Sequence, residues 1–125
     1  MELYESIKVK LLSGDLKHTT KLDWIKLYSK ESVQMMPGDF HRFNLGVSMI
    51  IPDGYEAIII PEEQIYENWS VIQTNAGEII PSNDDRIWTI PIYAFEKTFI
   101  ASGANIAKFR IQKTQPEVFY NLEFE

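Results

Sequence analysis

The sequence predicts an all-β domain of the jelly-roll or β-sandwich kind, with one short helix at most. Short apolar runs recur along the chain, and clusters of turn residues separate them. The length of 125 residues and the hydrophobic content of 45% suit a single domain with one packed core. We therefore expect one domain over residues 1–125.

The clearest strand lies in FNLGVSMII, residues 43–51. Every second residue of this run is apolar, which predicts a strand with one buried face. The Asp-Gly turn of PDGY, residues 52–55, leads into the apolar run EAIII, residues 56–60, so we expect a β-hairpin. Similar apolar runs predict further strands at residues 7–12, 24–28, 88–95, 105–112 and 118–124.

The stretch PEEQIYEN, residues 61–68, is the one segment with helix character, because acids near its start favour the positive terminus of a helix. Its adjacent acids, Glu62 and Glu63, fit either an acid–base pair or the charged start of this helix. At the C-terminus, residues 117–124 are apolar at alternate positions. Such a strand needs a sheet edge to pair with, in the same molecule or in a neighbour.

Composition argues against several functions. A net charge of -6 and a pI near 4.9 disfavour nucleic-acid binding, which requires clustered Lys and Arg. The chain has no Cys and two histidines, His18 and His41, which we expect at the surface, so a metal site would need mostly carboxylate ligands. No apolar stretch has the length of a membrane span, and the N-terminus lacks a signal-peptide core. We expect a soluble intracellular protein with no membrane partner.

Two longer segments resemble a known family. The run MPGDFHRFNLGVSMIIPDGYEAIIIP, followed by YENWSVIQTN, and the later run IWTIPIYAFEKTFIASGANIAKFRI are similar to homotrimeric dUTPases, particularly those of phages and prophages. The resemblance extends from about residue 24 to the C-terminus. It implies a distorted jelly roll of the β-clip type and active sites at subunit interfaces. It also implies cleavage of dUTP to dUMP and pyrophosphate, in the cytoplasm of a bacterial host.

The first two motifs of this family bind the metal-bound triphosphate. The first carries an Asp, and the resemblance places Lys26 of LDWIKLY at that position. The second reads Arg-Ser-Ser after a strand-ending Pro, and the resemblance places Glu62, Glu63 and Gln64 there. Because a carboxylate repels a phosphate that an Arg would attract, we expect triphosphate binding of the family kind to be lost.

The third motif, Gly-x-Ile-Asp followed by a Tyr, reads uracil and supplies the base that activates water. The matching segment is NAGEIIPSNDDRIW, residues 75–88, in which Asn75 corresponds to a position near uracil. Gly77 is retained, but the Asp falls at Ile80 or Pro81 and the Tyr is absent. Without this base, attack of water on phosphorus loses its main chemical aid.

The fourth motif, usually Gly-Asp-Arg-Ile-Cys/Ala-Gln, matches GANIAKFRI, residues 103–111, where Lys108 takes the place of the Gln. The fifth motif is a Gly-rich, Arg-containing arm that closes over the nucleotide, and the final residues NLEFE do not match it. Asp84 and Asp85 could supply a relocated base, but in PSNDD we expect them to be turn residues.

These changes predict a dUTPase-like protein of phage origin without catalytic residues, which acts as a protein-interaction or regulatory module with a host or phage partner. One alternative is a non-hydrolysing nucleotide-binding protein, in which Asn75, Lys26, Lys108 and Arg86 contact the ligand. A second is a divergent dUTP diphosphatase, the only case in which a cofactor, magnesium, is expected. We also expect a homotrimer, with the strand at 117–124 exchanged between subunits.

Overall fold

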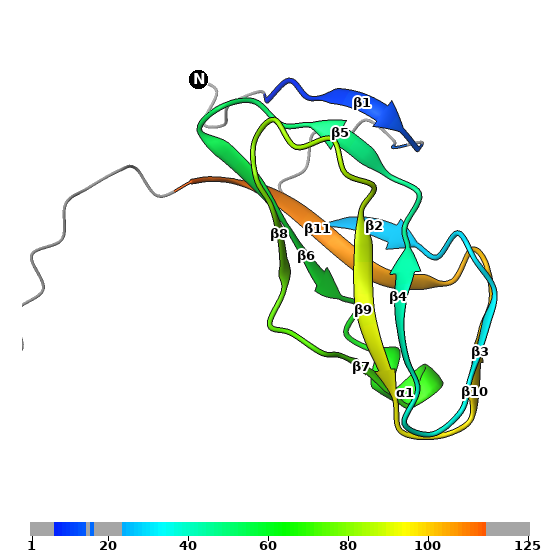
Figure 1. The fold of residues 1–125 in the computed structure, drawn as a ribbon. Coiled ribbons are helices and arrows are strands. Elements are labelled where there is room, and N and C mark those ends of the chain that lie inside the picture. Colours follow the sequence, from blue (N-terminus) through cyan, green and yellow to red (C-terminus); the bar gives the residue numbers. More distant parts are fainter. Residues whose placement is uncertain (1–6, 15, 17–23, 115–125) are drawn as a thin grey trace, which may run out of the picture.

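The computed structural model describes residues 7–14, 16 and 24–114, and strands make up most of its regular structure (Figure 1). The single helix among these residues is α1 (Ile65–Trp69). The predicted all-β fold with one short helix is confirmed. The strands are β1 (Lys10–Ser13), β2 (Ile25–Tyr28), β3 (Val33–Met35), β4 (Phe40–Asn44), β5 (Ser48–Ile50), β6 (Tyr55–Pro61), β7 (Val71–Gln73), β8 (Glu78–Ile80), β9 (Thr89–Ala94), β10 (Thr98–Ile100) and β11 (Asn105–Lys113).

Two larger sheets enclose the core. One has the strand order β2-β11-β6-β8 and the other has the order β4-β9-β7, and all their pairings are antiparallel. Two further two-stranded ribbons complete the described part of the chain: β1 with β5, at the top of Figure 1, and β3 with β10, at its lower right. In the core between the sheets, the rings of Trp88 and Phe109 meet edge to face, with centroids 4.9 Å apart.

The central strand β11 shows how alternation divides core from surface. Ala107 and Phe109 are buried, whereas the intervening Lys108 and the following Arg110 lie on the outer side of the sheet. β11 pairs with β2 on one side and with β6 on the other. The register of these three strands therefore decides which outward side chains become neighbours.

The predicted strand over residues 43–51 is interrupted in the structure. All five alternating apolar residues of this run are buried, as expected. However, β4 ends at Asn44 and β5 begins at Ser48, and the two strands belong to different sheets. Gly46 lies at the break with φ of +71°, a conformation that glycine adopts without a steric penalty. The side chain of Lys30 lies where a Cβ of this glycine would project.

The predicted hairpin at residues 52–55 is wrong. The turn itself forms, since the N–H of Tyr55 donates to the carbonyl of Pro52 at 3.2 Å. The strands on either side do not pair with each other: β5 pairs with β1, and β6 pairs with β11 and β8. The turn therefore carries the chain from one sheet to another.

Most of the remaining predicted strands and the predicted helix form in the structure. The runs at 24–28, 88–95 and 105–112 form β2, β9 and β11, and the helix lies within and just beyond 61–68. The run at 7–12 forms a strand only from Lys10. The expected strand at 117–124 lies outside the described residues. No helix in the described part of the chain is long and apolar enough to cross a membrane.

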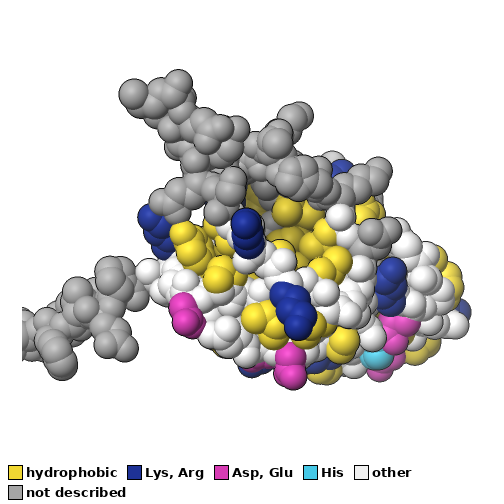
Figure 2. All heavy atoms as spheres, turned by 90° about the horizontal axis from the view of Figure 1, so that it is seen from above, with side chains coloured by type: hydrophobic (Ala, Val, Ile, Leu, Met, Phe, Trp, Pro, Cys, Tyr) yellow, Lys and Arg dark blue, Asp and Glu magenta, His cyan; other side chains and the backbone are white. Residues whose placement is uncertain are grey.

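The upper face of the molecule, over β1 and β5, carries exposed apolar side chains. Val9, Leu11 and Leu12 are all exposed there. Figure 2 shows hydrophobic side chains gathered on this face with Lys and Arg side chains among them.

Candidate functional site

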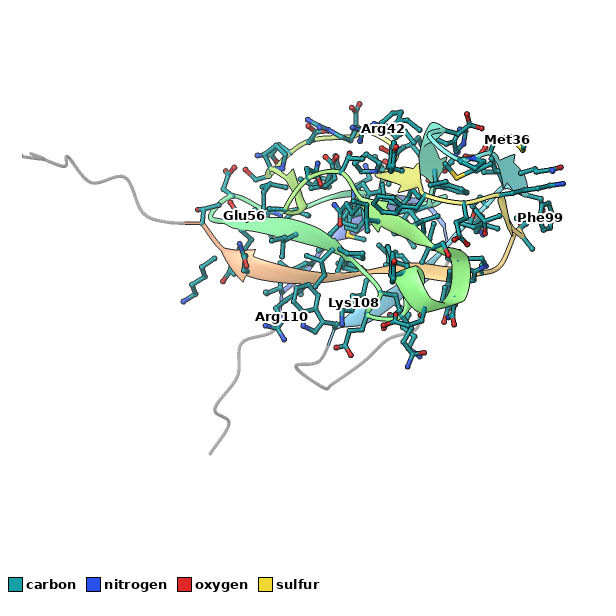
Figure 3. All side chains as sticks on the ribbon, turned by 90° about the horizontal axis from the view of Figure 1, so that it is seen from below. Met36, Arg42, Glu56, Phe99, Lys108 and Arg110 are labelled. Atoms are coloured by element: carbon teal, nitrogen blue, oxygen red, sulfur yellow. The ribbon has the colours of Figure 1, made fainter. Side chains whose placement is uncertain are left out.

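Three of the predicted site residues meet on the outer face of the β2-β11-β6-β8 sheet. Lys26 of β2 and Lys108 of β11 are register partners, so their side chains leave the sheet next to each other on the same side. Glu63 follows the end of β6, and its Oε1 accepts a hydrogen bond from Nζ of Lys108 at 3.3 Å. Figure 3 shows Lys108 and Arg110 on this outer side of β11.

The aromatic ring of Trp24 completes this group of side chains. The ring centroid lies 4.4 Å from the Arg110 guanidinium carbon and 5.8 Å from Nζ of Lys108, which are cation–π distances. The side chain of Lys108 is only 12% exposed, whereas that of Glu63 is 83% exposed. We call Trp24, Lys26, Glu63, Lys108 and Arg110 the charged cluster. No ion pair involves Lys26 within the described residues.

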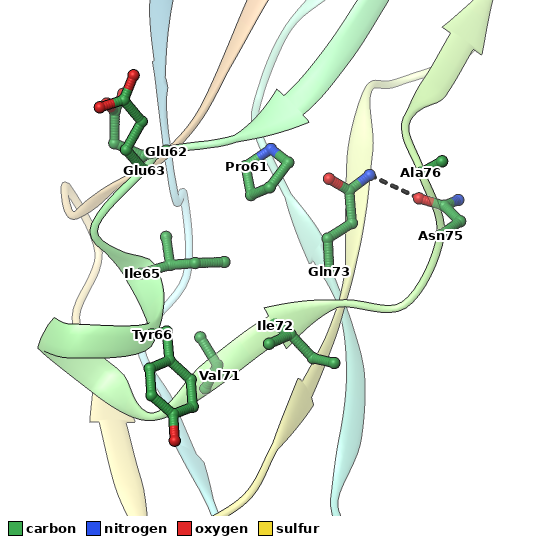
Figure 4. A pocket seen from close by; sticks show the side chains of 10 residues that line it. All are labelled: Pro61, Glu62, Glu63, Ile65, Tyr66, Val71, Ile72, Gln73, Asn75 and Ala76. Atoms are coloured by element: carbon green, nitrogen blue, oxygen red, sulfur yellow. Dashed lines mark hydrogen bonds between the residues drawn. The ribbon is translucent and has the colours of Figure 1, made fainter.

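A pocket of about 300 Å³ lies beside this cluster, where β6 passes into α1 (Figure 4). We call it the β6–α1 pocket. No Lys or Arg contributes to its lining. The residues that line it are Pro61, Glu62, Glu63, Ile65, Tyr66, Val71, Ile72, Gln73, Asn75 and Ala76.

Local structure positions the acids at one end of this pocket. The N–H of Glu62 donates to the carbonyl of Ile106 at 3.0 Å, which extends the pairing of β6 with β11 by one residue. The chain then turns, and α1 begins after Gln64, whose side chain makes no capping hydrogen bond. α1 ends at Trp69, and the C-cap residue Ser70 adopts a left-handed conformation with φ of 54°. Glu63 and Gln64 are exposed.

Two buried acceptors line the β6–α1 pocket. Oε2 of Glu62 and Oε1 of Gln73 are buried, and no donor from the described residues reaches either atom. A buried acceptor without a donor is unfavourable by about 1–3 kcal/mol. Figure 4 shows Gln73 and Asn75 on one side of the pocket and the two glutamates at its other end. The pocket therefore presents acceptors, and it favours a ligand that donates hydrogen bonds.

The side-chain amide of Asn75 is hydrogen-bonded to two other side chains of the protein. Its Oδ1 accepts from Nε2 of Gln73 at 2.6 Å, and its Nδ2 donates to Oε1 of Glu78 at 2.9 Å. The same Glu78 oxygen accepts from Nη1 of Arg42 at 2.8 Å. This network satisfies both ends of the Asn75 amide.

The remaining predicted positions lie away from the charged cluster. Gly77 precedes β8, and Ile80 is a core residue that pairs with Ala57 of β6. Pro81 is exposed just after β8. The side chain at position 80 thus packs into the core, where it cannot meet a substrate.

The two acids of the 81–85 turn have structural contacts. Hydrogen bonds from the Arg86 side chain hold the pKa of the Asp84 carboxyl below its usual value. The backbone carbonyl of Asp85 accepts from Oγ of Ser48 at 2.8 Å. These contacts fit the turn role that the sequence predicts.

The residues of the charged cluster do not fit a magnesium-bound triphosphate of the family kind. Lys26 adjoins a second cation, Lys108, across the sheet. An ammonium group has no lone pair for a metal ion. In residues 7–14, 16 and 24–114, no three His, Cys, Asp or Glu side chains gather where they could hold a metal.

Trp24, Arg110 and Gln73 also belong to the site, although the sequence did not indicate them. Alternation along β11 could have indicated Arg110, since it leaves the sheet on the same side as Lys108. The position of Trp24 depends on the pairing of β2 with β11, which the sequence does not reveal.

Comparisons with known proteins establish the family. The chain is 38% identical over 118 residues to the SPbeta prophage-derived deoxyuridine 5'-triphosphate nucleotidohydrolase YosS of Bacillus subtilis (strain 168), with 90% of this chain and 83% of that protein covered. No family model matches the chain. The chain therefore belongs to the deoxyuridine 5'-triphosphate nucleotidohydrolase, or dUTPase, family.

Solved structures of phage dUTPases share the fold. A mutant dUTPase from phage phi11 of S. aureus superposes with a TM-score of 0.75 at 17% identity, covering 97% of this chain and 99% of that one. The Staphylococcus bacteriophage 80alpha dUTPase with dUPNHPP gives a TM-score of 0.75 at 18% identity, covering 98% and 91%. The protein is thus dUTPase-like and of the phage type.

Proposed function

We propose that this dUTPase-family protein does not hydrolyse dUTP and instead binds a host or phage protein through the surface around the β6–α1 pocket. The observation that carries the proposal is the acidic pair at the end of β6. Glu62 and Glu63 follow Pro61, where the family motif carries Arg-Ser-Ser, and Glu63 is bonded to Lys108. Lys108 of β11 is therefore already opposed by an acid of the same chain.

Electrostatics makes this surface unfavourable for a triphosphate. At ~4 Å, a carboxylate and a phosphate charge repel each other by about 4 kcal/mol at an effective dielectric constant of about 20. The exposure of Glu63 reduces this figure through solvent screening. Oε2 of Glu62, in contrast, is buried. Repulsion at the end of β6 supports loss of triphosphate binding.

The third motif supports loss of catalysis. The position of its Asp corresponds to Ile80 or Pro81, and Ile80 packs in the core. Asp84 is hydrogen-bonded to Arg86 in a turn. Neither arrangement offers a base that could accept a proton from an attacking water.

A role beyond hydrolysis is described for structural neighbours of this chain. Phage dUTPases such as that of Staphylococcus bacteriophage 80alpha control the transfer of virulence genes. We propose a regulatory role for this chain on the surface of the same scaffold. We propose the bacterial cytoplasm as the place where it acts.

A divergent dUTPase is the second candidate, because the chain shares 38% identity with a protein named as a dUTP nucleotidohydrolase. In that case another group must take over the role of the missing Asp, and magnesium would be required. A third candidate, nucleotide binding without hydrolysis, is supported by the outward cations Lys26 and Arg110. The engaged amide of Asn75 argues against uracil recognition there.

Pyrophosphate release from dUTP in the presence of magnesium tests the proposal, with the YosS protein as the positive control. We expect no release above the rate without protein. Calorimetry with dUTP, dUMP and dTTP at millimolar concentration should show no heat of binding. Magnesium-dependent turnover would establish the divergent enzyme, and saturable heat without turnover would establish the nucleotide-binding candidate.

A further inference from the structure

The turn between β5 and β6 contains the one Asp or Asn of the sequence that a glycine follows. This pair is Asp53–Gly54, and both residues are exposed. The carboxyl group of an Asp can react with the backbone N–H of the next residue to form a succinimide ring. Glycine favours this reaction, because it has no Cβ to hinder approach to its nitrogen. The turn therefore combines a reactive pair with access to water.

The backbone conformation leaves open space beside this pair. Gly54 has φ of +86°, a left-handed conformation that glycine adopts without a steric penalty. A Cβ at this position would meet nothing within 4 Å. A succinimide ring, which joins Asp53 to the Gly54 nitrogen, would therefore form next to open space.

Three hydrogen bonds from other segments hold the turn. Nδ2 of Asn83 donates to Oδ1 of Asp53 at 2.6 Å. The backbone N–H of Asn83 donates to the carbonyl of Ile51 at 2.9 Å, and that of Thr114 donates to the carbonyl of Gly54 at 3.0 Å. We call these three contacts the turn clasp. Figure 1 shows its place, where the start of β6 lies beside the end of β11.

One contact of the turn clasp restrains the reacting group itself. Before the ring can close, the Asp53 side chain must rotate until its carboxyl carbon reaches the Gly54 nitrogen. The bond from Asn83 holds one oxygen of that carboxyl group in place. Ring closure therefore requires that this hydrogen bond break first.

We propose that Asp53–Gly54 is a site of spontaneous isomerisation and that the Asn83 contact sets its rate. The Gly54 nitrogen forms a bond to Cγ of Asp53, and the carboxyl hydroxyl leaves with the amide proton as water. Water then adds to one of the two ring carbonyls. Opening at Cγ restores Asp53, whereas opening at the main-chain carbonyl gives isoaspartate of unchanged mass.

Isoaspartate at this position would disrupt the turn clasp. The main chain would run through Cβ and Cγ of residue 53, so it would be one carbon longer, and the free carboxylate would leave its place beside Asn83. The Gly54 carbonyl would shift relative to its donor, Thr114. Because Thr114 directly follows β11, the change reaches the point where the chain leaves the sheet. This modification does not depend on the interaction role proposed above.

Digestion of the aged protein with endoproteinase Asp-N tests the proposal, since this protease cleaves before Asp and not before isoaspartate. The purified protein is kept in mildly acidic buffer, and samples are unfolded and digested. We expect cleavage before Asp53 to decline with time, and mass spectrometry to detect a species that has lost one water. Cleavage before Asp39 is the internal control and should stay complete. Asp39 is also exposed and also accepts a hydrogen bond, but Phe40 follows it.

Matched variants separate the role of the glycine from that of the turn clasp. Gly54→Ala should slow the loss of cleavage about tenfold, because a Cβ hinders approach to the nitrogen. Asp53→Glu keeps a carboxylate but would need a larger ring, so it should not isomerise. Asn83→Gly suits the left-handed backbone at φ of 60° and removes the amide, so it should accelerate the loss several-fold. If it loses its circular dichroism spectrum, Asn83→Asp serves in its place, since Asp also tolerates this conformation and its carboxylate donates no hydrogen bond.

Three results would overturn the inference. Cleavage before Asp53 that stays complete, while a peptide of sequence IPDGYEA loses it under the same conditions, would show that the fold protects the site. An equal decline before Asp39 would indicate general damage. Equal rates in wild type and Asn83→Gly would show that the turn clasp does not set the rate.

Discussion

Lys108 and Glu63 illustrate how one ion pair can change what a surface binds. Lys108 is largely covered, by Trp24 among others, and its ammonium is bonded to Glu63, which itself is mostly in water. Because Glu63 is 83% exposed, solvent screening keeps the contribution of this pair to stability small, typically up to about 1 kcal/mol. Its larger effect is to place a negative charge beside the outward cations of β2 and β11.

Neutralising the acids at the end of β6 should create weak affinity for a triphosphate. In a Glu62→Gln/Glu63→Gln variant, Lys26, Lys108 and Arg110 would face the anion without opposing charge. We expect binding of inorganic tripolyphosphate to strengthen about tenfold, which corresponds to about 1.4 kcal/mol. Calorimetry at low salt measures it, and Glu56→Gln is the control. Unchanged affinity would mean that the acids do not shield these cations.

The Glu31 carboxyl predicts a pH dependence of stability. Its Oε1 accepts from His41 Nε2 at 2.8 Å and from the N–H of Asn44 at 3.1 Å, and the hydrogen bond from His41 leads in holding the Glu31 pKa below its usual value of 4.5. A pKa lowered by folding stabilises the protein above the unfolded pKa, and this contribution disappears as the pH falls through the folded pKa.

Glu31→Gln should therefore lower the free energy of unfolding near pH 7 by less than about 1 kcal/mol, since both side chains are over one third exposed. The difference from wild type should shrink as the pH falls below 4.5. Urea unfolding of both proteins between pH 7 and pH 3 measures it. A difference that stays constant over this range would contradict the assignment.

At the scale of elements, two glycines with matched backbone angles separate conformational strain from steric fit. Gly14 has φ of +89° and Gly54 has φ of +86°, and both conformations cost other residues about 1–2 kcal/mol. A Cβ on Gly14 would lie 2.6 Å from the carbonyl oxygen of Gly46, whereas a Cβ on Gly54 would meet nothing within 4 Å.

We expect Gly54→Ala to reduce the free energy of unfolding by about 1 kcal/mol, and Gly14→Ala to reduce it by about 1–3 kcal/mol more. The added loss comes from backbone atoms, which cannot rotate away as a side chain would. Guanidinium unfolding of the two variants gives the comparison. Equal losses would show that the β1 segment moves aside without cost.

The elements that the sequence predicts well are those with a periodic pattern of sufficient length. β2, β9 and β11 were predicted, and the buried face of residues 43–51 was correct. The strands β3, β7, β8 and β10 have three residues each, too few for a periodic pattern. The break at Gly46 was missed because it depends on distant groups: the N–H of Leu45 next to it donates to the carbonyl of Trp88.

The candidate site was partly predictable, because several of its residues occupy motif positions of the family that the sequence resembles. The resemblance indicated Lys26, Glu63 and Lys108, and the structure brings these three together. The resemblance did not predict that the β6–α1 pocket would lack Lys and Arg. The lining of this pocket comes from β6, α1, β7 and the segment after β7, and their arrangement cannot be read from the sequence.

At the scale of the whole molecule, the family resemblance predicts a homotrimer. Light scattering should give a mass near three times 14.6 kDa. If the segment at 117–124 is exchanged between subunits, a chain truncated after Pro116 should dissociate, because the exchanged strand would join neighbouring copies. A monomer at micromolar concentration would contradict the trimer, and an intact trimer after truncation would contradict the exchange alone.

The alternation along β11 determines which of its residues can be substituted during evolution without loss of the fold. Ala107 and Phe109 hold the two sheets together, while Lys108 and Arg110, on the same strand, face outward. A mutation at an outward position therefore alters the chemistry of the surface and leaves the core packing unchanged. Within this one strand, the residues that determine the fold and the residues that determine the surface chemistry are therefore different and can change independently.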